Sequence, residues 1–151
     1  MPKDSFFMLE AISLAKLASE QGEIPVGAVI VDVHENIIAT AFNLRETSHS
    51  AIAHAEVLVI EEACKKLGRW RLHDCTLYVT LEPCFMCAGA IVLARIPRVV
   101  FAAHDPKAGA VKSLANVLTD ARLNHQCIVE AGVEENEARN LLKDFFRARR
   151  K

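Results

Sequence analysis

Residues 76–94 read TLYVTLEPCFMCAGAIVLA and carry the strongest structural signal in the chain. The first six, Thr76 to Leu81, favour a strand because they are apolar, aromatic or β-branched. Pro83 cannot continue a strand, since it lacks a backbone N–H, but it suits the first turn of a helix. The run from Phe85 to Ala94 contains no charged residue and is apolar on nearly every side. The stretch therefore predicts a strand that passes directly into a buried helix.

Further strands and helices are expected on both sides of this stretch. Upstream, the sequence predicts a helix that is capped by Asp4 or Ser5 and stopped by Gly22. Two strands, Val26–Val31 and Ile37–Phe42, are expected to form an antiparallel hairpin across His34–Asn36. A loop over Asn43–Ala53 and a helix over His54–Leu67, which ends at Gly68, should follow. Those predicted downstream are strands Val99–Ala103 and Cys127–Ala131, a turn over Asp105–Gly109, and an amphipathic helix over Glu134–Arg150. Strands that alternate with helices after a hairpin predict an α/β fold, a three-layer α/β/α sandwich with a central mixed five-stranded sheet.

The composition fits one domain spanning residues 1–151. Hydrophobic residues make up 52% and charged residues 25%, which excludes disordered, collagen-like and low-complexity classes. The longest uncharged apolar run, 85–94, is too short for a membrane span, which needs about 18 residues. The first residues lack the pattern of a signal peptide, so we expect a cytoplasmic protein.

A net charge of −1 gives no global reason to expect nucleic-acid binding. A local patch is possible at the C-terminal end, where four cations crowd the last five residues: Arg147, Arg149, Arg150 and Lys151. These cations suit a solvated helix end, where they complement the helix dipole, and they equally suit contact with RNA.

The chain has five cysteines, and an odd number without a signal peptide argues against a disulfide framework. Cys84 and Cys87 are the only closely spaced pair. A Cys-x-x-Cys alone could bind metal, act in redox chemistry or do neither. Cys64, Cys75 and Cys127 lie among apolar neighbours, and we expect them to be small buried hydrophobic residues.

A second motif, His54-Ala55-Glu56, gives the cysteine pair a chemical partner. Two cysteines three apart at a helix start lie on one face, and the helix N-terminus favours the thiolate. With His54 they make three zinc ligands, the number typical of catalytic sites that keep an open position for water. Glu56 is offset from His54 around the helix, so it would lie beside the metal and exchange protons with that water. The combination indicates hydrolytic chemistry on an electrophilic carbon.

His-x-Glu followed by Pro-Cys-x-x-Cys is the known signature of zinc-dependent nucleobase deaminases, of which the tRNA-adenosine deaminases are the established example. The chain resembles the bacterial tRNA-specific adenosine deaminase family, with its cytidine deaminase-like fold, along nearly its whole length. The resembling segments are 25–31, Asn43, 54–56, 80–91, 98–101, 105–110, 123–125 and 145–150. The long block around Cys84, the Asp-Pro-Lys-Ala-Gly turn and the Phe-Phe-Arg ending are far more specific than the zinc motif alone.

The resemblance implies hydrolysis of adenosine to inosine at the wobble position of a tRNA anticodon, chiefly in an arginine tRNA. It implies a cytoplasmic homodimer with one Zn²⁺ per subunit. It places His54, Cys84 and Cys87 on the zinc ligands and Glu56 on the proton shuttle.

The resemblance also implies a set of substrate contacts. It places Asn43 on the flipped base, Asp105 near the sugar, Phe146 and Arg149 near RNA, and the pocket wall on Val26, Gly27, Ala55 and Leu81. Each has a structural alternative. Asn43 could close a loop, Asp105 could start a turn, and one of Phe145 and Phe146 should be a core residue.

Three other functions remain open. The chain could deaminate a free base or nucleoside such as guanine or cytidine, in which case a basic, aromatic C-terminal helix would be unnecessary. It could be a zinc-stabilised binding module, although an acidic residue beside an open metal site argues against this. It could be a thiol–disulfide oxidoreductase built on Cys84 and Cys87. The apolar helix over 86–94 could also contribute a subunit interface.

Overall fold

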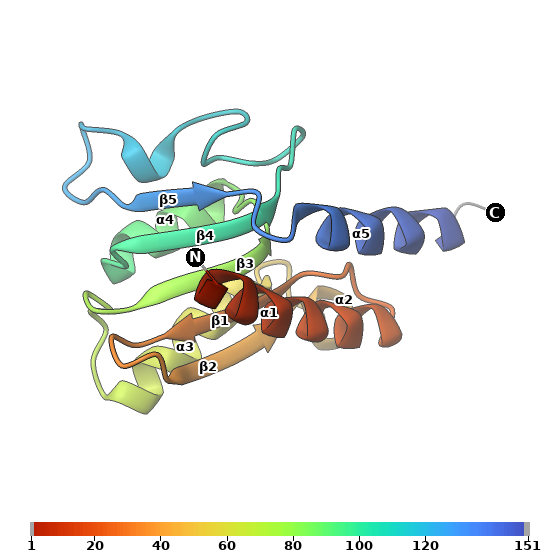
Figure 1. The fold of residues 1–151 in the computed structure, drawn as a ribbon, viewed down its shortest axis with the longest axis horizontal. Helices are drawn as coiled ribbons and strands as arrows, with labels where there is room; N and C mark the ends of the chain where they lie inside the picture. Colours follow the sequence, from red (N-terminus) through yellow and green to blue (C-terminus); the bar gives the residue numbers. More distant parts are fainter. Residues whose placement is uncertain (1, 150–151) are drawn as a thin grey trace.

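The structure is a computed structural model that describes residues 2–149, built around a five-stranded sheet in the order β2-β1-β3-β4-β5 (Figure 1). Arg150 and Lys151, from the predicted basic ending, lie outside the described residues. The strands are β1 (Gly27–Val31), β2 (Ile37–Phe42), β3 (Thr76–Leu81), β4 (Arg98–Ala103) and β5 (Ile128–Ala131). The helices are α1 (Pro2–Glu20), α2 (Arg45–Ser48), α3 (Ala55–Leu67), α4 (Phe85–Ala94) and α5 (Glu135–Arg149), with a 3₁₀ turn over Val117–Thr119.

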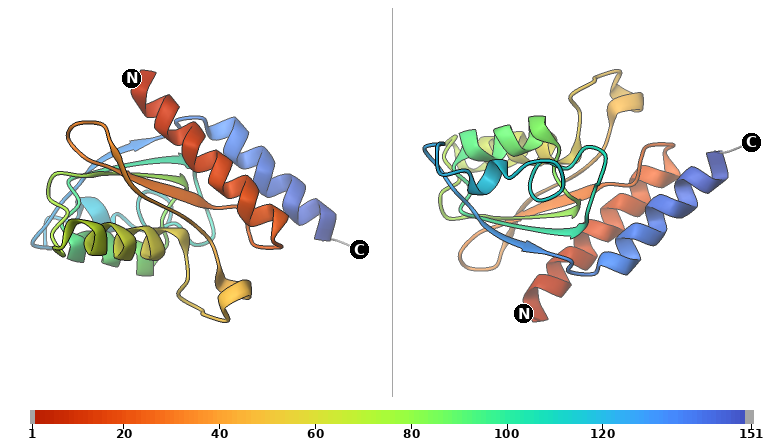
Figure 2. Two further views of the ribbon diagram at one scale, coloured as in Figure 1. Left: turned by 90° about the horizontal axis from the view of Figure 1, so that it is seen from below. Right: turned by 90° about the horizontal axis from the view of Figure 1, so that it is seen from above.

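The sheet is mixed, as the sequence predicts. β1 pairs antiparallel with both β2 and β3, whereas β3–β4 and β4–β5 are parallel pairs. Helices α1 and α5 lie side by side on one face, and α3 and α4 cover the other face (Figure 2). The predicted three-layer α/β/α sandwich is therefore confirmed.

The pattern of burial along the strands follows their place in the sheet. Every residue of β1 is buried, because helices cover both faces of this interior strand and both of its edges are paired. The edge strands β2 and β5 are only partly buried. A continuous run of Ala, Val and Ile is the sequence expected of a strand that is buried on both faces.

Several predicted boundaries differ from the observed ones. α1 begins at Pro2, so Asp4 and Ser5 lie inside the helix and neither is its N-cap. The predicted loop over 43–53 contains the short helix α2. Cys75 and Cys127 are buried as expected, but Cys64 is only partly buried. The α4 helix is less covered than its composition predicts, since Leu93 is 71% exposed.

The partners of Asp4 are distant in sequence, which is why no local pattern indicates its role. Its carboxylate accepts hydrogen bonds from Tyr78 Oη at 2.6 Å and from Arg98 Nη1 and Nη2 at 2.9 and 2.7 Å. The bonds from Arg98 hold the pKa of Asp4 below its usual range despite its burial. A partly buried ion pair thus joins the start of α1 to β3 and β4.

We expect Asp4→Ala to lower the free energy of unfolding by about 2–3 kcal/mol, because it leaves the Arg98 guanidinium without its carboxylate. Asp120→Ala is the matched control, since its partner Arg122 is 90% exposed and ion pairs between exposed groups contribute little to stability. Urea unfolding at neutral pH compares the two variants. Because the pKa of Asp4 is lowered on folding, its contribution is complete at neutral pH and is lost as the pH falls below about 4. Equal costs for the two substitutions would contradict this account.

Within residues 2–149, none of the helices combines the length and the apolar character that crossing a membrane requires.

Candidate functional site

A pocket of about 270 Å³ opens at one end of the sheet. Because β1 runs antiparallel to β2 and β3, the start of β1 lies beside the ends of both neighbours. The starts of α3 and α4 and the loop after β4 complete the pocket. Its lining residues are Ile24, Val26, Asn43, Arg45, His54, Ala55, Glu56, Leu81, Glu82, Cys84, Asp105 and Ala108.

Two helix N-termini bring the metal-binding residue types together. His54 is the N-cap of α3, and Cys84 is the N-cap of α4. Both have extended backbone angles, so each side chain leaves the chain at the point where the helix starts. Cys87 follows on the first turn of α4 and is buried. Exposed N–H groups at a helix start stabilise thiolates, which makes this placement suitable for zinc ligands.

The three side chains fit a zinc ion. His54 Nδ1 lies 3.6 Å from Cys84 Sγ and 3.5 Å from Cys87 Sγ, and all three atoms lie within 4.8 Å of one another. For tetrahedral zinc with ordinary Zn–N and Zn–S bond lengths, the nitrogen-to-sulfur distance is about 3.6 Å. The spacing therefore matches that of a zinc site with three protein ligands.

The local electrostatics favour a thiolate at this position. Hydrogen bonding from the Cys87 thiol, together with His54, lowers the pKa of Cys84 to about 3. The same bond to Cys84, reinforced by burial, raises the pKa of Cys87. The bond to Cys84 also raises the pKa of His54. The Cys84 thiolate is thus favoured in a place where a cation could bind.

Glu56 lies on the first turn of α3 and is 4% exposed. Burial raises the pKa of this carboxyl group to about 7. It is not part of the three-atom cluster. A carboxyl group that both gains and loses a proton near neutral pH is suited to acid–base chemistry beside a metal.

Asn43 lines the pocket and also closes a loop. It is buried, its Nδ2 donates to the Ile24 carbonyl at 3.4 Å, and its Oδ1 accepts from the Arg45 backbone N–H at 3.2 Å. These bonds fix the direction in which the amide faces the pocket.

The predicted pocket wall is largely present. Val26, Ala55 and Leu81 line the pocket, whereas Gly27 does not. A Cβ atom on Gly27 would lie 2.0 Å from the Ala11 carbonyl oxygen, so this position allows the close approach of α1 to β1. Asp105 lines the pocket, and its Oδ1 also accepts backbone N–H bonds from the following turn.

A neighbouring groove joins the pocket to the C-terminal helix. It shares Ile24, Leu81, Asp105 and Ala108 with the pocket, and adds Phe146 and Arg149 from α5, together with Leu142, His104 and Lys107. Phe146 is 43% exposed, whereas Phe145 is buried beneath the Arg149 guanidinium, 4.3 Å from its ring centroid. As expected, one of the two phenylalanines belongs to the core.

Several residues around the pocket belong to none of the motifs recognised in the sequence. Arg45 and Ala108 line it, and the buried carboxylates Glu23 and Glu82 hold the loops beside it. Glu82 could have been noticed in the sequence, because it is the only charged residue in the apolar stretch 76–94. Burial disfavours its charge, but hydrogen bonds from Ser113 and nearby backbone N–H groups outweigh this and lower the pKa of Glu82 to about 2.

Comparison with known proteins gives consistent similarities. Residues 1–103 match the family described as the cytidine and deoxycytidylate deaminase zinc-binding region. The chain is 57% identical to the tRNA-specific adenosine deaminase of Bacillus subtilis (strain 168) over 151 residues, which is 100% of this chain and 93% of that protein.

Among solved structures, one from work on A-to-I editing by tRNA deaminases at the wobble position is similar, with a TM-score of 0.87 and 42% identity. The match covers 91% of this chain and 99% of that chain. A guanine deaminase structure from Bacillus subtilis matches less of the chain. It has a TM-score of 0.62 and 46% identity, and the match covers 66% of this chain and 63% of that one.

Proposed function

This chain belongs to the family of tRNA-specific adenosine deaminases, and we propose that it hydrolyses adenosine to inosine at the wobble position of a tRNA anticodon. The observation that carries the proposal is a cluster of three potential zinc ligands beside a buried carboxyl group, at a pocket that continues into a groove along α5. We treat residues 1–151 as one deaminase domain that acts in the cytoplasm.

His54, Cys84 and Cys87 are the proposed zinc ligands, with one ion per subunit. When bound, zinc lowers the pKa of a coordinated water toward neutrality and so makes it nucleophilic.

Glu56 is the proposed proton shuttle. Its carboxylate accepts a proton from the attacking water and delivers it to the ring nitrogen. It then takes the proton of the newly added hydroxyl group and delivers it to the amino group, which leaves as ammonia. Burial supports this role, because it brings the pKa of Glu56 close to neutrality and keeps bulk water from competing for the proton.

Asn43 and the apolar wall hold the adenine. An asparagine amide offers a donor and an acceptor, which suits the edge of a base, and its direction is fixed by its own loop contacts. Val26, Ala55 and Leu81 provide apolar surface for the ring, and Asp105, which lines both the pocket and the neighbouring groove, binds a sugar hydroxyl. An anticodon-loop base is already partly unstacked, so its flipping into such a pocket costs less than in a duplex.

The groove along α5 favours RNA over a free base or nucleoside. Phe146 offers an exposed ring for stacking, and Arg149 and Lys107 offer positive charge for phosphates. A free guanine or cytidine would fill the pocket and leave this groove unused. The arginine tRNA implied by the family resemblance is the substrate we propose.

Phe146→Ala is expected to lower kcat/KM for an anticodon stem-loop by about 5- to 100-fold, because stacking contributes about 1–3 kcal/mol per base. Arg149→Ala should act in the same direction through loss of a phosphate contact. Arg147→Ala is the control, since Arg147 pairs with Asp144 and does not line the groove. Steady-state kinetics on the stem-loop measure all three. Unchanged kinetics in both groove variants would contradict the assigned RNA path.

A substrate panel tests the function itself. Release of ammonia is measured with an anticodon stem-loop carrying adenosine at the wobble position, and with free adenosine, guanine and cytidine. We expect release from the stem-loop alone. Release from a free base or nucleoside, with none from RNA, would replace the proposal by the alternative of a small-molecule deaminase.

We also propose a homodimer in which α4 packs against a second copy. Phe85, Met86 and Leu93 on this helix are exposed apolar side chains, and the first two directly follow the proposed zinc ligand Cys84. Sedimentation is expected to give twice the chain mass at micromolar concentration. A monomer under those conditions would contradict this assembly.

A further inference from the structure

The buried carboxylate of Glu82 accepts five hydrogen bonds, although it has no part in the proposed chemistry. It is 2% exposed. Oε1 accepts hydrogen bonds from the Asp105 backbone N–H at 3.0 Å and from Ser113 Oγ at 2.5 Å. Oε2 accepts from the backbone N–H groups of Val111, Lys112 and Ser113 at 3.2, 2.8 and 2.8 Å. Every one of these partners lies in the segment 105–113, which follows β4 in the chain.

The backbone beside Glu82 is tied to the same segment. The Ala110 N–H donates to the Pro83 carbonyl at 2.9 Å, and Cys84 forms an isolated antiparallel bridge with Gly109. A Cβ atom on Gly109 would lie 2.3 Å from Glu82 Cδ, so glycine is needed for this close approach.

The segment held in this way forms one side of the pocket. Asp105 and Ala108 line it, together with His54 and Asn43. Glu82 lies two residues before Cys84, one of the proposed zinc ligands. Its carboxylate therefore links the position of this wall to the position of Cys84. A glutamine would retain the shape but would turn an NH₂ group toward N–H donors, which cannot bond to it.

We propose that Glu82 is a positioning residue: its carboxylate sets the Asp105–Ala108 wall relative to Cys84 and thereby controls substrate binding. This proposal rests on the proposed function for its substrate. Glu82 is not a metal ligand and takes no part in proton transfer.

Glu82→Gln is expected to retain zinc at the wild-type stoichiometry and to lower kcat/KM for the stem-loop by about 10- to 100-fold, mainly through KM. Hydrogen–deuterium exchange should increase in residues 105–113 and stay unchanged in α3. Ser113→Ala removes one donor and keeps the carboxylate, so it should shift KM in the same direction by a smaller factor. This milder variant keeps the proposal testable where Glu82→Gln folds poorly.

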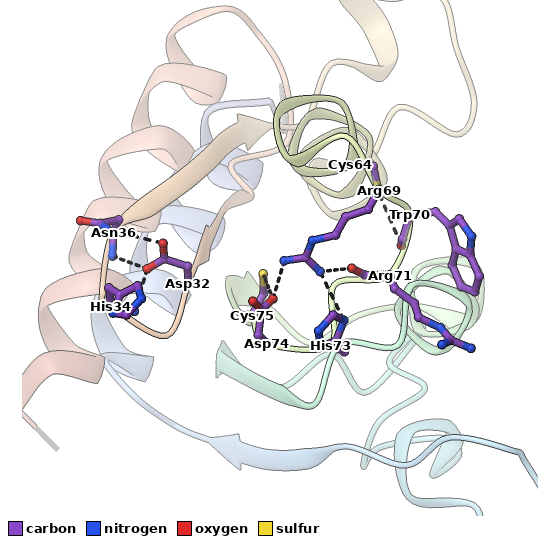
Figure 3. A network of polar contacts seen from close by, with 10 residues as sticks. All are labelled: Asp32, His34, Asn36, Cys64, Arg69, Trp70, Arg71, His73, Asp74 and Cys75. Atoms are coloured by element: carbon purple, nitrogen blue, oxygen red, sulfur yellow. Dashed lines mark hydrogen bonds and ion pairs between the residues drawn. The ribbon is translucent and has the colours of Figure 1, made fainter.

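Asp32→Asn is the matched control. Asp32 also accepts backbone N–H bonds in a turn, from His34 and Asn36 at 2.9 Å each, but it follows β1 at the end of the sheet away from the pocket (Figure 3). The same change from carboxylate to amide should leave KM and zinc content at wild-type values.

A double-mutant cycle with Asp105→Ala separates positioning from general stabilisation. If Glu82 acts through this wall, its substitution should have little further effect on KM once Asp105 is removed. Additive effects, a wild-type KM in Glu82→Gln, or loss of zinc in that variant would each overturn the proposal. Failure of the wild-type protein to act on RNA would instead overturn the proposed function, and the exchange measurement would still test the role of Glu82.

Discussion

Glu56→Ala is expected to lower turnover by at least about 10³-fold while zinc remains bound at the wild-type stoichiometry. The loss follows from removal of the group that moves protons, because general acid–base catalysis typically contributes about 10²–10⁴-fold and Glu56 acts at more than one step. The metal should remain because His54, Cys84 and Cys87 form the ligand cluster without Glu56.

Single-turnover formation of inosine and metal analysis of the same preparation measure the two quantities together. Glu62→Gln, on the exposed side of α3, is the control and should match the wild type in both. Loss of zinc in Glu56→Ala would mean that this carboxylate is a ligand. Retained turnover would remove it from the chemistry altogether.

The second large effect is expected from the ligands themselves. Cys84→Ser and His54→Ala should lose zinc, activity and stability together, because the energy of metal binding is also folding energy. If the wild type is held at about a thousand times its dissociation constant for zinc, the stability lost is about 4 kcal/mol.

A chelator provides the internal control for this prediction. It should lower the Tm of the wild type toward that of the ligand variants and should leave the variants unchanged. Cys64→Ser, on the partly buried cysteine that donates to the Trp70 carbonyl, should retain zinc and respond to the chelator as the wild type does. Full zinc occupancy in Cys84→Ser or His54→Ala would contradict the ligand assignment.

The parts of the fold that were predicted correctly depend on local sequence. β2 and β3 have the predicted bounds, because each is a continuous run of strand-forming residues between turn residues. Gly68 ends α3 in the left-handed conformation, as a glycine at that point predicts. His54 and Cys84 could also be predicted from local sequence, because each stands at the start of a helix.

The features that were missed depend on contacts between distant segments. The α2 helix forms where Glu23 accepts backbone N–H bonds from Glu46 and Thr47, a pairing that no local pattern indicates. The groups that donate hydrogen bonds to Glu82 likewise lie more than 20 positions away in the sequence. A buried carboxylate of this kind is identified only when its donors are seen.

The most direct test of the proposed reaction uses a tRNA anticodon stem-loop with adenosine at the wobble position. After incubation with the zinc-loaded protein, mass spectrometry of the RNA fragments locates any inosine, with Glu56→Ala and free adenosine alongside. We predict inosine at the wobble position alone, none in the variant and none from free adenosine. An unmodified stem-loop after incubation with fully zinc-loaded wild-type protein would contradict the central claim.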